Sequence, residues 1–399
     1  MTDILNLDDL GLDSLEGVPT LLRVDFNVPL ADGKVMDDTR LRAALPTISE
    51  LRAAGARLLV MSHCGRPKGL VVPEFSLRPV ATTLGEMLGD DVAFAEDCIG
   101  QPAQDQLQAL EPGRVCLLEN LRFHPGETTN DPEFADRLAE LGQAYVNDAF
   151  GTAHRAHASV VGIPERIERK AAGRLMIDEV DALSGLLDEP ARPFVAIVGG
   201  AKIGDKVATV SNLLDRLDCL VLGGGMANTF LASLGYDLAD SLFENDKLDV
   251  ARDILHRAQA ADIQVLLPED LVVTDDLDKP QTIETVGAAK VPAGFKAVDI
   301  GQQACRAIDT ALEGSKTVLW NGPMGVFEKP PFNKGTVLVA RVVAECEGFT
   351  VVGGGETVAA VRQAGLAAEI SHISTGGGAS LEFLAGKTLP GLFALEKTS

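Results

Sequence analysis

The sequence has few cysteines, no excess of positive charge and no long apolar run, and each shortage excludes a class of protein. Its six cysteines are scattered, without a CxxC pair or a spacing typical of metal ligands, so neither a disulfide framework nor a zinc finger is expected. No stretch approaches the roughly 18 uncharged apolar residues of a membrane span. The first ten residues carry acidic rather than basic side chains, unlike an export signal. We therefore expect a reduced, cytoplasmic protein with no membrane partner.

The formal net charge is −23, which argues against nucleic acid as a partner because binding a phosphate backbone needs a cationic face. Against so acidic a background, any place where Arg and His gather is informative. Such places are candidate sites for small anions.

Short apolar runs alternate with longer amphipathic stretches along the whole chain. The expected strands are Leu21–Phe26, Arg57–Met61, Val115–Leu118, Ala144–Asn147, Phe194–Val198, Cys219–Leu222, Gln264–Leu267, Thr317–Trp320 and Thr350–Val352. This alternation predicts an α/β fold with parallel sheets that are covered by helices on both faces. A length of 399 residues exceeds what one core supports, so we predict two doubly wound, Rossmann-like domains with a cleft between them.

The predicted boundary between the domains is a helix. Residues 174–188 have helical periodicity and end just before Pro190 and a new strand. The expected organisation is an N-terminal domain over 1–173, a joining helix over 174–188 and a C-terminal domain over 189–386.

In the first half, charged side chains follow four strands directly. Arg and His gather there, and the side chains concerned are Asp25, Asn27, His63, Arg66, Arg122, His154, Arg155 and His157, with Arg40 at the start of a helix. Carboxyl ends of parallel strands share one edge, so these side chains are expected to converge. Guanidinium groups match phosphate and carboxylate oxygens in pairs, which predicts a site for a small polyanion.

In the second half, glycine clusters follow the strands instead. They occur at Gly199–Gly200, Gly223–Gly225, Gly353–Gly355 and Gly376–Gly378, and the first precedes two lysines at helical spacing, Lys202 and Lys206. None completes a known phosphate fingerprint, since Leu381 replaces the first glycine of a P-loop pattern ending at Thr388. Together with the acidic Glu356 they nevertheless favour a nucleotide triphosphate.

Two other functions remain open at this point. A two-lobed protein could close on an anion without chemistry, although it would not need Lys202, Lys206 and Glu356 in its second half. A nicotinamide-dependent dehydrogenase is disfavoured because no G-x-G-x-x-G motif is present.

Eight segments of the chain resemble the signature segments of the phosphoglycerate kinase family, in the order of that family. They are Arg23–Pro29 (RVDFNVP), Ser62–Pro67 (SHCGRP), Leu118–Phe123 (LENLRF), Asn147–His157 (NDAFGTAHRAH), Val198–Lys202 (VGGAK), Leu222–Met226 (LGGGM), Trp320–Glu328 (WNGPMGVFE) and Ser374–Ser380 (STGGGAS). The resemblance implies reversible phosphoryl transfer from 1,3-bisphosphoglycerate to ADP, giving 3-phosphoglycerate and ATP, with Mg²⁺ carried by the nucleotide. It also implies a monomer.

The resemblance implies the following site residues. The glycerate would be held by Asp25, Phe26, Asn27, Arg40, His63, Cys64, Gly65, Arg66, Arg122 and Arg155. The nucleotide would be held by Gly200, Ala201, Lys202, Lys206, Gly223, Gly224, Gly301, Met324, Glu328, Gly354, Gly355, Glu356 and Thr357, with Glu356 also reaching the metal. Arg40, Lys202, Gly376 and Gly377 would stabilise the phosphoryl group in direct in-line transfer as the domains close.

Two residues depart from the family pattern. Glu356 stands where the family usually has Asp, and Cys64 where it usually has Leu. The longer carboxylate is expected to affect metal geometry, and Cys64 is interpreted as a packing substitution. The family's chain path further implies that residues 387–399 fold back onto the N-terminal domain.

Overall fold

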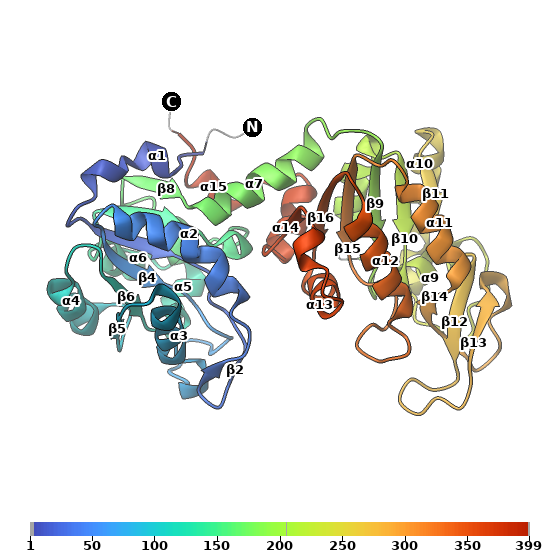
Figure 1. The fold of residues 1–399 in the computed structure, drawn as a ribbon, viewed down its shortest axis with the longest axis horizontal. Coiled ribbons are helices and arrows are strands. Elements are labelled where there is room, and N and C mark those ends of the chain that lie inside the picture. Colours follow the sequence, from blue (N-terminus) through green and yellow to red (C-terminus); the bar gives the residue numbers. More distant parts are fainter. Residues whose placement is uncertain (1–3, 205, 398–399) are drawn as a thin grey trace. The chain divides into compact units, whose positions relative to one another are not determined.

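The computed structural model describes residues 4–204 and 206–397, and this chain divides into two compact units (Figure 1). Unit 1 contains residues 4–181 and 388–397, and unit 2 contains the described residues of 182–387. The division falls inside a helix, α7 (Arg174–Leu187), rather than at either end of it. The first part of this helix thus belongs to unit 1 and the rest to unit 2, whereas the sequence analysis expected the whole of 174–188 to be a joining segment.

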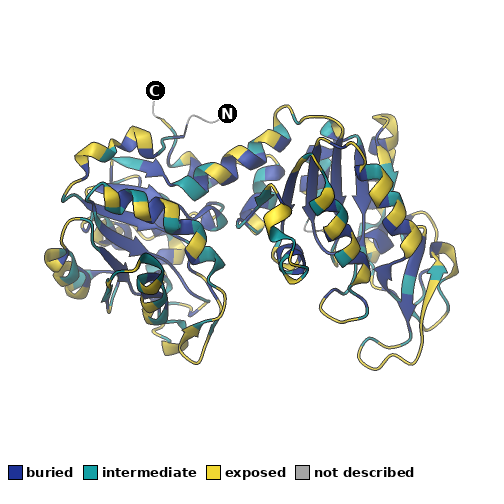
Figure 2. Cartoon of the chain, viewed as in Figure 1, coloured by how far each residue is buried: buried dark blue, intermediate teal, exposed yellow. Residues whose placement is uncertain are grey.

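Unit 1 is built on a six-stranded parallel sheet. Its strands are β5 (Val92–Ala95), β6 (Val115–Leu118), β4 (Arg57–Met61), β1 (Pro19–Arg23), β7 (Ala144–Asn147) and β8 (Lys170–Ala172), in that order. A short hairpin, β2 (Leu30–Ala31) and β3 (Lys34–Val35), follows β1. All residues of β1, β6 and β7 are buried, as expected for strands that are covered on both faces (Figure 2).

The helices of unit 1 cover this sheet. They are α1 (Leu7–Leu10), α2 (Thr39–Ala53), α3 (Arg78–Leu88), α4 (Gly100–Ala109), α5 (Pro125–Thr129), α6 (Pro132–Ala139) and α15 (Pro390–Phe393), with the first part of α7. Alternate strand residues such as Leu22, Val60 and Leu117 form one core with Ile48 of α2 and Leu84 of α3. These helices therefore bury their apolar stripes against one face of the sheet.

Unit 2 has the same plan. Its parallel strands, in order, are β11 (Gln264–Leu266), β10 (Cys219–Leu222), β9 (Phe194–Val198), β15 (Thr317–Asn321), β16 (Phe349–Gly353) and β17 (His372–Ile373). The helices are α8 (Val207–Leu213), α9 (Gly224–Ser233), α10 (Leu248–Ala260), α11 (Gln302–Leu312), α12 (Lys334–Glu345), α13 (Gly355–Gln363) and α14 (Gly378–Leu384). Trp320 lies fully buried in the core that the sheet shares with α11, α12 and α13.

A second, antiparallel sheet of three strands extends unit 2. Its strands, in order, are β13 (Ile283–Gly287), β12 (Asp270–Thr274) and β14 (Lys296–Ile300). A small core of its own, including Leu271 and Val273, joins it to Leu231 of α9. This sheet was not expected from the sequence.

The two ends of the described chain both lie on unit 1. Ile4 and Glu396 form an isolated antiparallel bridge, and the Leu5 amide donates to the Leu395 carbonyl at 3.0 Å. The Gly391 amide donates to the Ala153 carbonyl at 2.8 Å. The C-terminal segment after Lys387 is thus part of unit 1, although unit 2 separates it from the rest of unit 1 in sequence.

The predicted fold class, two doubly wound parallel-sheet units, is confirmed. The first expected strand, Leu21–Phe26, begins and ends too late, because the structure places β1 at Pro19–Arg23 and leaves Asp25 in the following loop. Among the described residues, no helix is long and apolar enough to cross a membrane.

Candidate functional site

The carboxyl ends of β1, β4 and β7 lie level in unit 1. Arg23, the last residue of β1, pairs in register with Met61 of β4 and with Asn147 of β7. The segments that follow these strands therefore start at one edge of the sheet. This is the edge where ligands bind in open α/β sheets.

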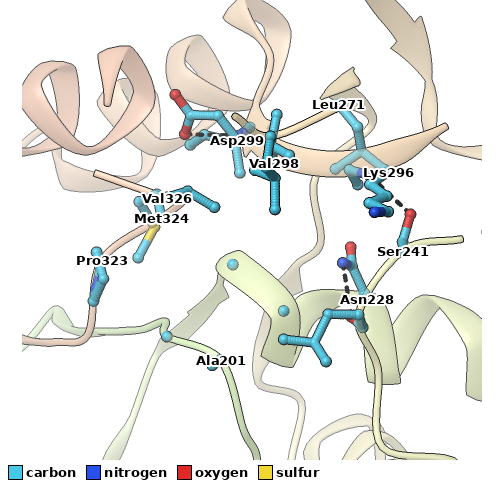
Figure 3. Close-up of a pocket in the computed structure, with 18 of the residues that line it drawn as sticks. Ala201, Asn228, Ser241, Leu271, Lys296, Val298, Asp299, Pro323, Met324 and Val326 are labelled. Atoms are coloured by element: carbon cyan, nitrogen blue, oxygen red, sulfur yellow. Dashed lines mark hydrogen bonds between the residues drawn. The ribbon is translucent and has the colours of Figure 1, made fainter. Parts of the chain in front are cut away.

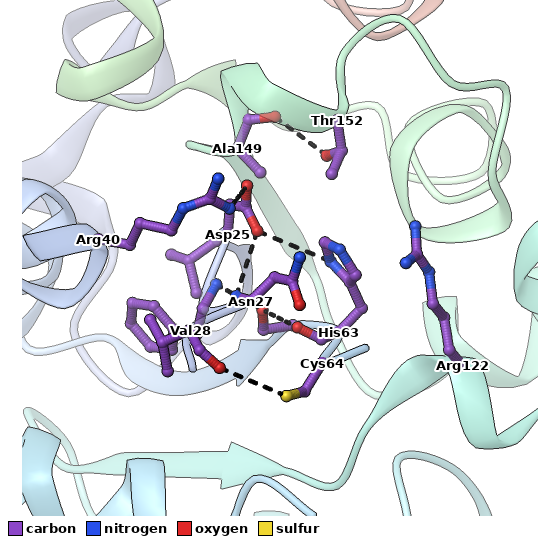
Figure 4. Close-up of polar contacts among 12 residues, drawn as sticks. Asp25, Asn27, Val28, Arg40, His63, Cys64, Arg122, Ala149 and Thr152 are labelled. Carbon is purple, nitrogen blue, oxygen red and sulfur yellow. Dashed lines mark hydrogen bonds and ion pairs between the residues drawn. The ribbon is translucent and has the colours of Figure 1, made fainter. Parts of the chain in front are cut away.

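Asp25, Arg40 and His63 meet at this edge (Figure 4). Arg40, from the first turn of α2, donates to Asp25 Oδ2, and His63 Nδ1 lies 3.8 Å from Asp25 Oδ1. The side chain of Arg40 is 36% exposed, whereas that of His63 is 4% exposed. The guanidinium of Arg40 is thus held in place by Asp25 and still open to a ligand.

Arg23 is a member of this cluster that the sequence analysis did not assign. It is fully buried, and it donates from Nε to Ser159 Oγ at 2.9 Å while its Nη2 lies 3.2 Å from His63 Nδ1. Ser159 in turn donates to the buried carboxylate of Glu127 at 2.7 Å. A buried guanidinium needs such compensation, so Arg23 both positions His63 and adds positive potential to the edge.

Asn27, Gly65 and Arg122 form the next part of the edge. The Gly65 amide donates to Asn27 Oδ1 at 2.9 Å, and Arg122 Nη1 donates to the Gly65 carbonyl at 2.9 Å. Gly65 has φ +62°, and a Cβ there would collide with the ring of Phe75, so only glycine fits this turn. In Figure 4, His63 lies between Arg40 and Arg122.

Arg122 has donor capacity that the described protein does not use. Its Nε is buried and has no hydrogen-bond partner among the residues that the structure describes. Burial, and then the neighbouring Arg23, lower the pKa of Arg122 from its ordinary value. An orphaned guanidinium donor beside other cations is the arrangement expected of an anion site.

The remaining predicted residues of unit 1 lie differently. Arg66 and Arg155 are exposed, whereas Phe26 and Cys64 are buried. Burial raises the pKa of the Cys64 thiol to about 11, and Phe26 belongs to the sheet core. Since their side chains are buried, Cys64 and Phe26 can offer a ligand only backbone groups.

Two histidines of the edge, His63 and His157, have lowered pKa values. Burial, followed by the charge of Arg23, lowers the pKa of His63 well below its usual value. Burial and Arg122 lower the pKa of His157 to about 4. Arginines therefore supply positive charge at this edge, and the lowered pKa values favour His63 and His157 as neutral hydrogen-bonding groups.

Unit 2 contains a cavity of about 590 Å³ between α9, β14 and the loop after β15 (Figure 3). The predicted nucleotide residues that line it are Gly200, Ala201, Gly224, Met324, Glu328 and Glu356. Gly224 has φ +63°, and a Cβ there would approach the Gly200 carbonyl oxygen to 2.7 Å. Glycine thus lets the α9 turn lie directly against the loop after β9.

Two residues predicted to contact adenosine, Gly301 and Gly223, are not among the residues that line the cavity. Gly301 does not line the cavity, because it lies at the start of α11 against the carboxylate of Asp270. Ala297 and Val298 of β14 line the cavity instead, since the unexpected antiparallel sheet supplies that wall. Gly223 lies behind the wall and contacts Met324 rather than the open space.

The two predicted phosphate lysines are in different states. Lys202 is exposed, whereas Lys206 is partly buried and donates to the carbonyls of Gly199 at 2.6 Å and Asn321 at 3.0 Å. Neither lines the cavity itself. Lys206 therefore fastens the ends of β9 and β15 together in this structure.

The start of α13 presents a carboxylate beside the cavity. Gly354, with φ +88°, precedes this helix, and the exposed Glu356 in its first turn lines the cavity. Thr357 is buried and accepts a hydrogen bond from the Gly322 amide at 2.6 Å, so its hydroxyl is already engaged. An exposed carboxylate oxygen at the cavity fits Mg²⁺, which is a hard cation that prefers oxygen ligands.

Gly376 and Gly377 lie just before the short helix α14. Gly377 has φ +54°, and the Gly376 amide donates to Ser374 Oγ at 3.2 Å. Neither glycine lines the cavity. Any contact that they make to a phosphoryl group is thus outside the cavity wall.

Asp299 is a cavity residue that the sequence analysis missed. It lines the cavity, accepts from the Ile300 amide at 2.9 Å and from the Gly335 amide at 2.7 Å, and burial raises its pKa to about 7. It lies within β14, between Val298 and Ile300, so the pattern that identified Asp25, a polar residue just after a strand, does not single it out.

The fold and these two sheet-edge sites define a two-unit, doubly wound α/β protein. A family model described as phosphoglycerate kinase matches residues 7–387. The chain therefore belongs to the phosphoglycerate kinase family, which is a family of phosphotransferases.

Individual relatives agree with this family. A phosphoglycerate kinase of Moorella thermoacetica is 52% identical over 98% of both chains, and one of Roseiflexus sp. is 50% identical over 95% of this chain and 96% of the relative. A solved phosphoglycerate kinase structure from Coxiella burnetii covers 98% of both chains with 40% identity and a TM-score of 0.88. These matches do not support a binding protein without chemistry or a nicotinamide-dependent dehydrogenase.

Proposed function

We propose that this chain transfers a phosphoryl group reversibly between 1,3-bisphosphoglycerate and ADP, with 3-phosphoglycerate and ATP as the products. The observation that carries the proposal for this particular chain is the arginine cluster of unit 1, in which the buried Arg122 Nε has no partner among the described residues. A phosphorylated carboxylic acid supplies the anionic oxygens that such donors require.

In unit 1 the protein's task is binding and charge neutralisation. The carboxylate of 3-phosphoglycerate is already a nucleophile, so no general base is needed. His63 and His157 would therefore act as hydrogen-bonding groups rather than as bases. Asp25 and Asn27 would accept from the substrate hydroxyl, while Arg122 would donate to its phosphate. Arg40, which is partly exposed, would neutralise charge on the transferring group.

In unit 2 the cavity would take the nucleoside. Met324 and Gly224 form apolar walls suited to a flat base, and the carboxylate of Glu328 would accept from ribose hydroxyls. The exposed Lys202 would reach the phosphates. Mg²⁺, when bound with the nucleotide, neutralises phosphate charge, and Glu356 would hold it with a carboxylate one methylene longer than the family's usual Asp.

Direct transfer also requires that the two ligands meet during turnover. We therefore include in the proposal a closure of the two units on their substrates. The family resemblance further favours a monomer, which sedimentation of the ligand-free and ligand-bound chain would test.

The test is ATP consumption that depends on 3-phosphoglycerate, with wild type, Arg40→Ala and Arg42→Ala compared. Arg42 is the matched control, because it lies on the same helix and its ion pair with Asp38 is exposed. Arg40→Ala should lower kcat/KM by about 100-fold or more, as expected when a group that stabilises transition-state charge is removed. Arg42→Ala should remain near wild type.

Two outcomes would overturn the proposal. One is ATP consumption that does not depend on 3-phosphoglycerate. The other is equal activity of Arg40→Ala and Arg42→Ala, which would show that the arginine cluster is not the substrate site.

A further inference from the structure

Three side chains with different metal-binding atoms, none of them assigned to the substrate, meet near the carboxyl ends of β5 and β6 in unit 1. Asp97 and Cys98 lie between β5 and α4, and His124 precedes α5. β5 and β6 are neighbouring parallel strands, with Ala95 in register with Leu118. The segments that follow these two strands are therefore brought side by side, although Asp97 and His124 are far apart in sequence.

The geometry of this Asp97–Cys98–His124 cluster is compact. One ligand atom of each residue lies within 4.8 Å of the other two, and His124 Nε2 lies 2.6 Å from Asp97 Oδ1. The ring of His124 stacks on Phe134 with centroids 5.2 Å apart. The imidazole is thus fixed by its neighbour, as is usual for an ordered metal ligand.

We propose that Asp97, Cys98 and His124 form a binding site for a divalent transition metal of the Zn²⁺ type. Thiolate sulfur, imidazole nitrogen and carboxylate oxygen together are the donor set of Zn²⁺ and Co²⁺, whereas Mg²⁺ and Ca²⁺ take oxygen ligands. Three protein ligands leave a fourth position for water or another ligand.

Access to the site is open on one side. Cys98 is only 1% exposed, but the side chains of Asp97 and His124 are 39% and 29% exposed. A surface cavity of about 330 Å³, lined by Ile99, Phe134 and His124 among others, adjoins the cluster. His124 lines this cavity and the side chain of Asp97 is partly exposed, so a cation could reach the buried sulfur past these two ligands.

Only small movements are needed for coordination. Bonds of the usual length to Zn²⁺ place tetrahedral ligands roughly 3.3–3.8 Å apart. The Asp97–His124 pair at 2.6 Å would widen by about an ångström, and the sulfur lies no further than 4.8 Å from either partner. Since Asp97 and His124 are partly exposed, they have room for this adjustment.

The surroundings of Cys98 favour a cation. The carboxylates of Asp97 and Glu127 act electrostatically on the buried Cys98. A bound dication would compensate these carboxylates and deprotonate the sulfur on coordination. The contact between His124 and Asp97 does not involve the adjacent thiol, whereas a bound metal would use all three side chains.

The test is titration of the full, reduced chain with Zn²⁺, followed by isothermal calorimetry, for wild type and three variants. Cys98→Ser and His124→Gln each remove one proposed ligand. Cys346→Ser is the matched control, because it removes a thiol that is partly exposed and lies in unit 2. Wild type and the control should bind one equivalent of Zn²⁺ that the two ligand variants bind at least about tenfold more weakly.

Co²⁺ gives a second readout that does not depend on a variant folding correctly. In wild type, bound Co²⁺ should show a sulfur-to-metal charge-transfer band in the near ultraviolet, because one ligand is a thiolate. Absence of that band at saturation would overturn the proposal. Zn²⁺ binding that is equally strong in wild type, Cys98→Ser and His124→Gln would also overturn the proposal, because it would show that Zn²⁺ binds only to surface carboxylates.

Discussion

Lys202 and Lys206 look equivalent in the sequence, at i and i+4, but the structure gives them different surroundings. The exposed Lys202 has a charge available to a ligand. Lys206 fastens Gly199 and Asn321 at the ends of two neighbouring strands. Its ammonium group therefore contributes to stability as well as to any contact with phosphate.

We predict that Lys206→Ala lowers the free energy of unfolding of unit 2 by about 1.5–3 kcal/mol, the usual contribution of hydrogen bonds to a charged group. Lys202→Ala should leave stability within about 0.5 kcal/mol of wild type, as for other exposed positions. Urea unfolding followed by the fluorescence of Trp320, the only Trp, measures both. Equal stability of the two variants would contradict the structural role of Lys206.

Asp148 is a buried carboxylate whose ionisation is costly. Burial raises its pKa to about 6, and its Oδ2 has no hydrogen-bond partner among the described residues. The other oxygen accepts from the Met176 amide at 3.1 Å, at the start of α7. An Asn at this position keeps that acceptor and carries no charge.

We predict that Asp148→Asn changes how stability depends on pH. The pKa of Asp148 in the folded state lies above its unfolded value of about 3.9. The protonated carboxyl therefore stabilises folded wild type below about pH 3.9, and this stabilisation is lost as the pH rises through about 6. The stability of Asp148→Asn relative to wild type should therefore rise by about 1 kcal/mol between about pH 5 and about pH 7.5. Urea unfolding at both pH values measures it, with the exposed Asp13→Asn as control. A constant difference between Asp148→Asn and wild type would contradict the assignment.

Individual contacts were predictable from the sequence only where a residue directly follows a strand. Asp25, His63 and Arg122 satisfy that rule, and the structure brings them to one edge. The rule did not identify Arg23 and Glu127, because their buried network depends on Ser159 and on packing between segments that are distant in sequence. The rule did not find the Asp97–Cys98–His124 cluster, because β5, the strand that Asp97 and Cys98 follow, was not among the expected strands.

At the scale of elements, the segment with α15 shows how a short helix can matter. Leu395 is fully buried and Leu392 is 5% exposed, whereas Phe393 is 64% exposed. The segment also pairs with the start of the chain through Leu5 and Leu395. Its apolar face is thus part of the core of unit 1.

We predict that Leu395→Ala lowers the stability of unit 1 by about 2–5 kcal/mol, the usual range for a buried leucine. Phe393→Ala is the matched control, with an expected change within about 0.5 kcal/mol. Far-ultraviolet circular dichroism reports both units, while Trp320 reports unit 2 alone. An effect of Leu395→Ala on the Trp320 transition only would contradict the assignment of this segment to unit 1.

The central parallel strands were predictable because both their faces are buried, which leaves continuous apolar runs such as Cys219–Leu222. The antiparallel sheet was not, since β13 is mostly exposed and β14 begins with a lysine. Because β13 is exposed over most of its length, its sequence carries no apolar run. The same unexpected sheet supplies Ala297, rather than Gly301, to the cavity wall.

For the whole molecule, the proposed function divides the two substrates between the units. We predict that ADP with Mg²⁺ raises the urea midpoint reported by Trp320, because this residue lies in the core of unit 2. At a hundredfold excess over Kd the gain should approach about 2.7 kcal/mol. An unchanged Trp320 midpoint under saturating nucleotide would contradict a nucleotide site in unit 2, and inorganic sulfate at equal ionic strength is the control.

The bridge between Ile4 and Glu396 brings the two ends of the described chain next to each other. A gene that joins the two ends of this sequence by a short linker and starts instead near Pro190, after α7, would encode residues 190–387 first. Unit 1 would then follow as one uninterrupted stretch, with its present last segment at the front. In the present chain, unit 1 is complete only after unit 2 has been synthesised, because residues 388–397 come last. The permutant would therefore change the order in which the segments are synthesised while leaving the segments that pack together unchanged.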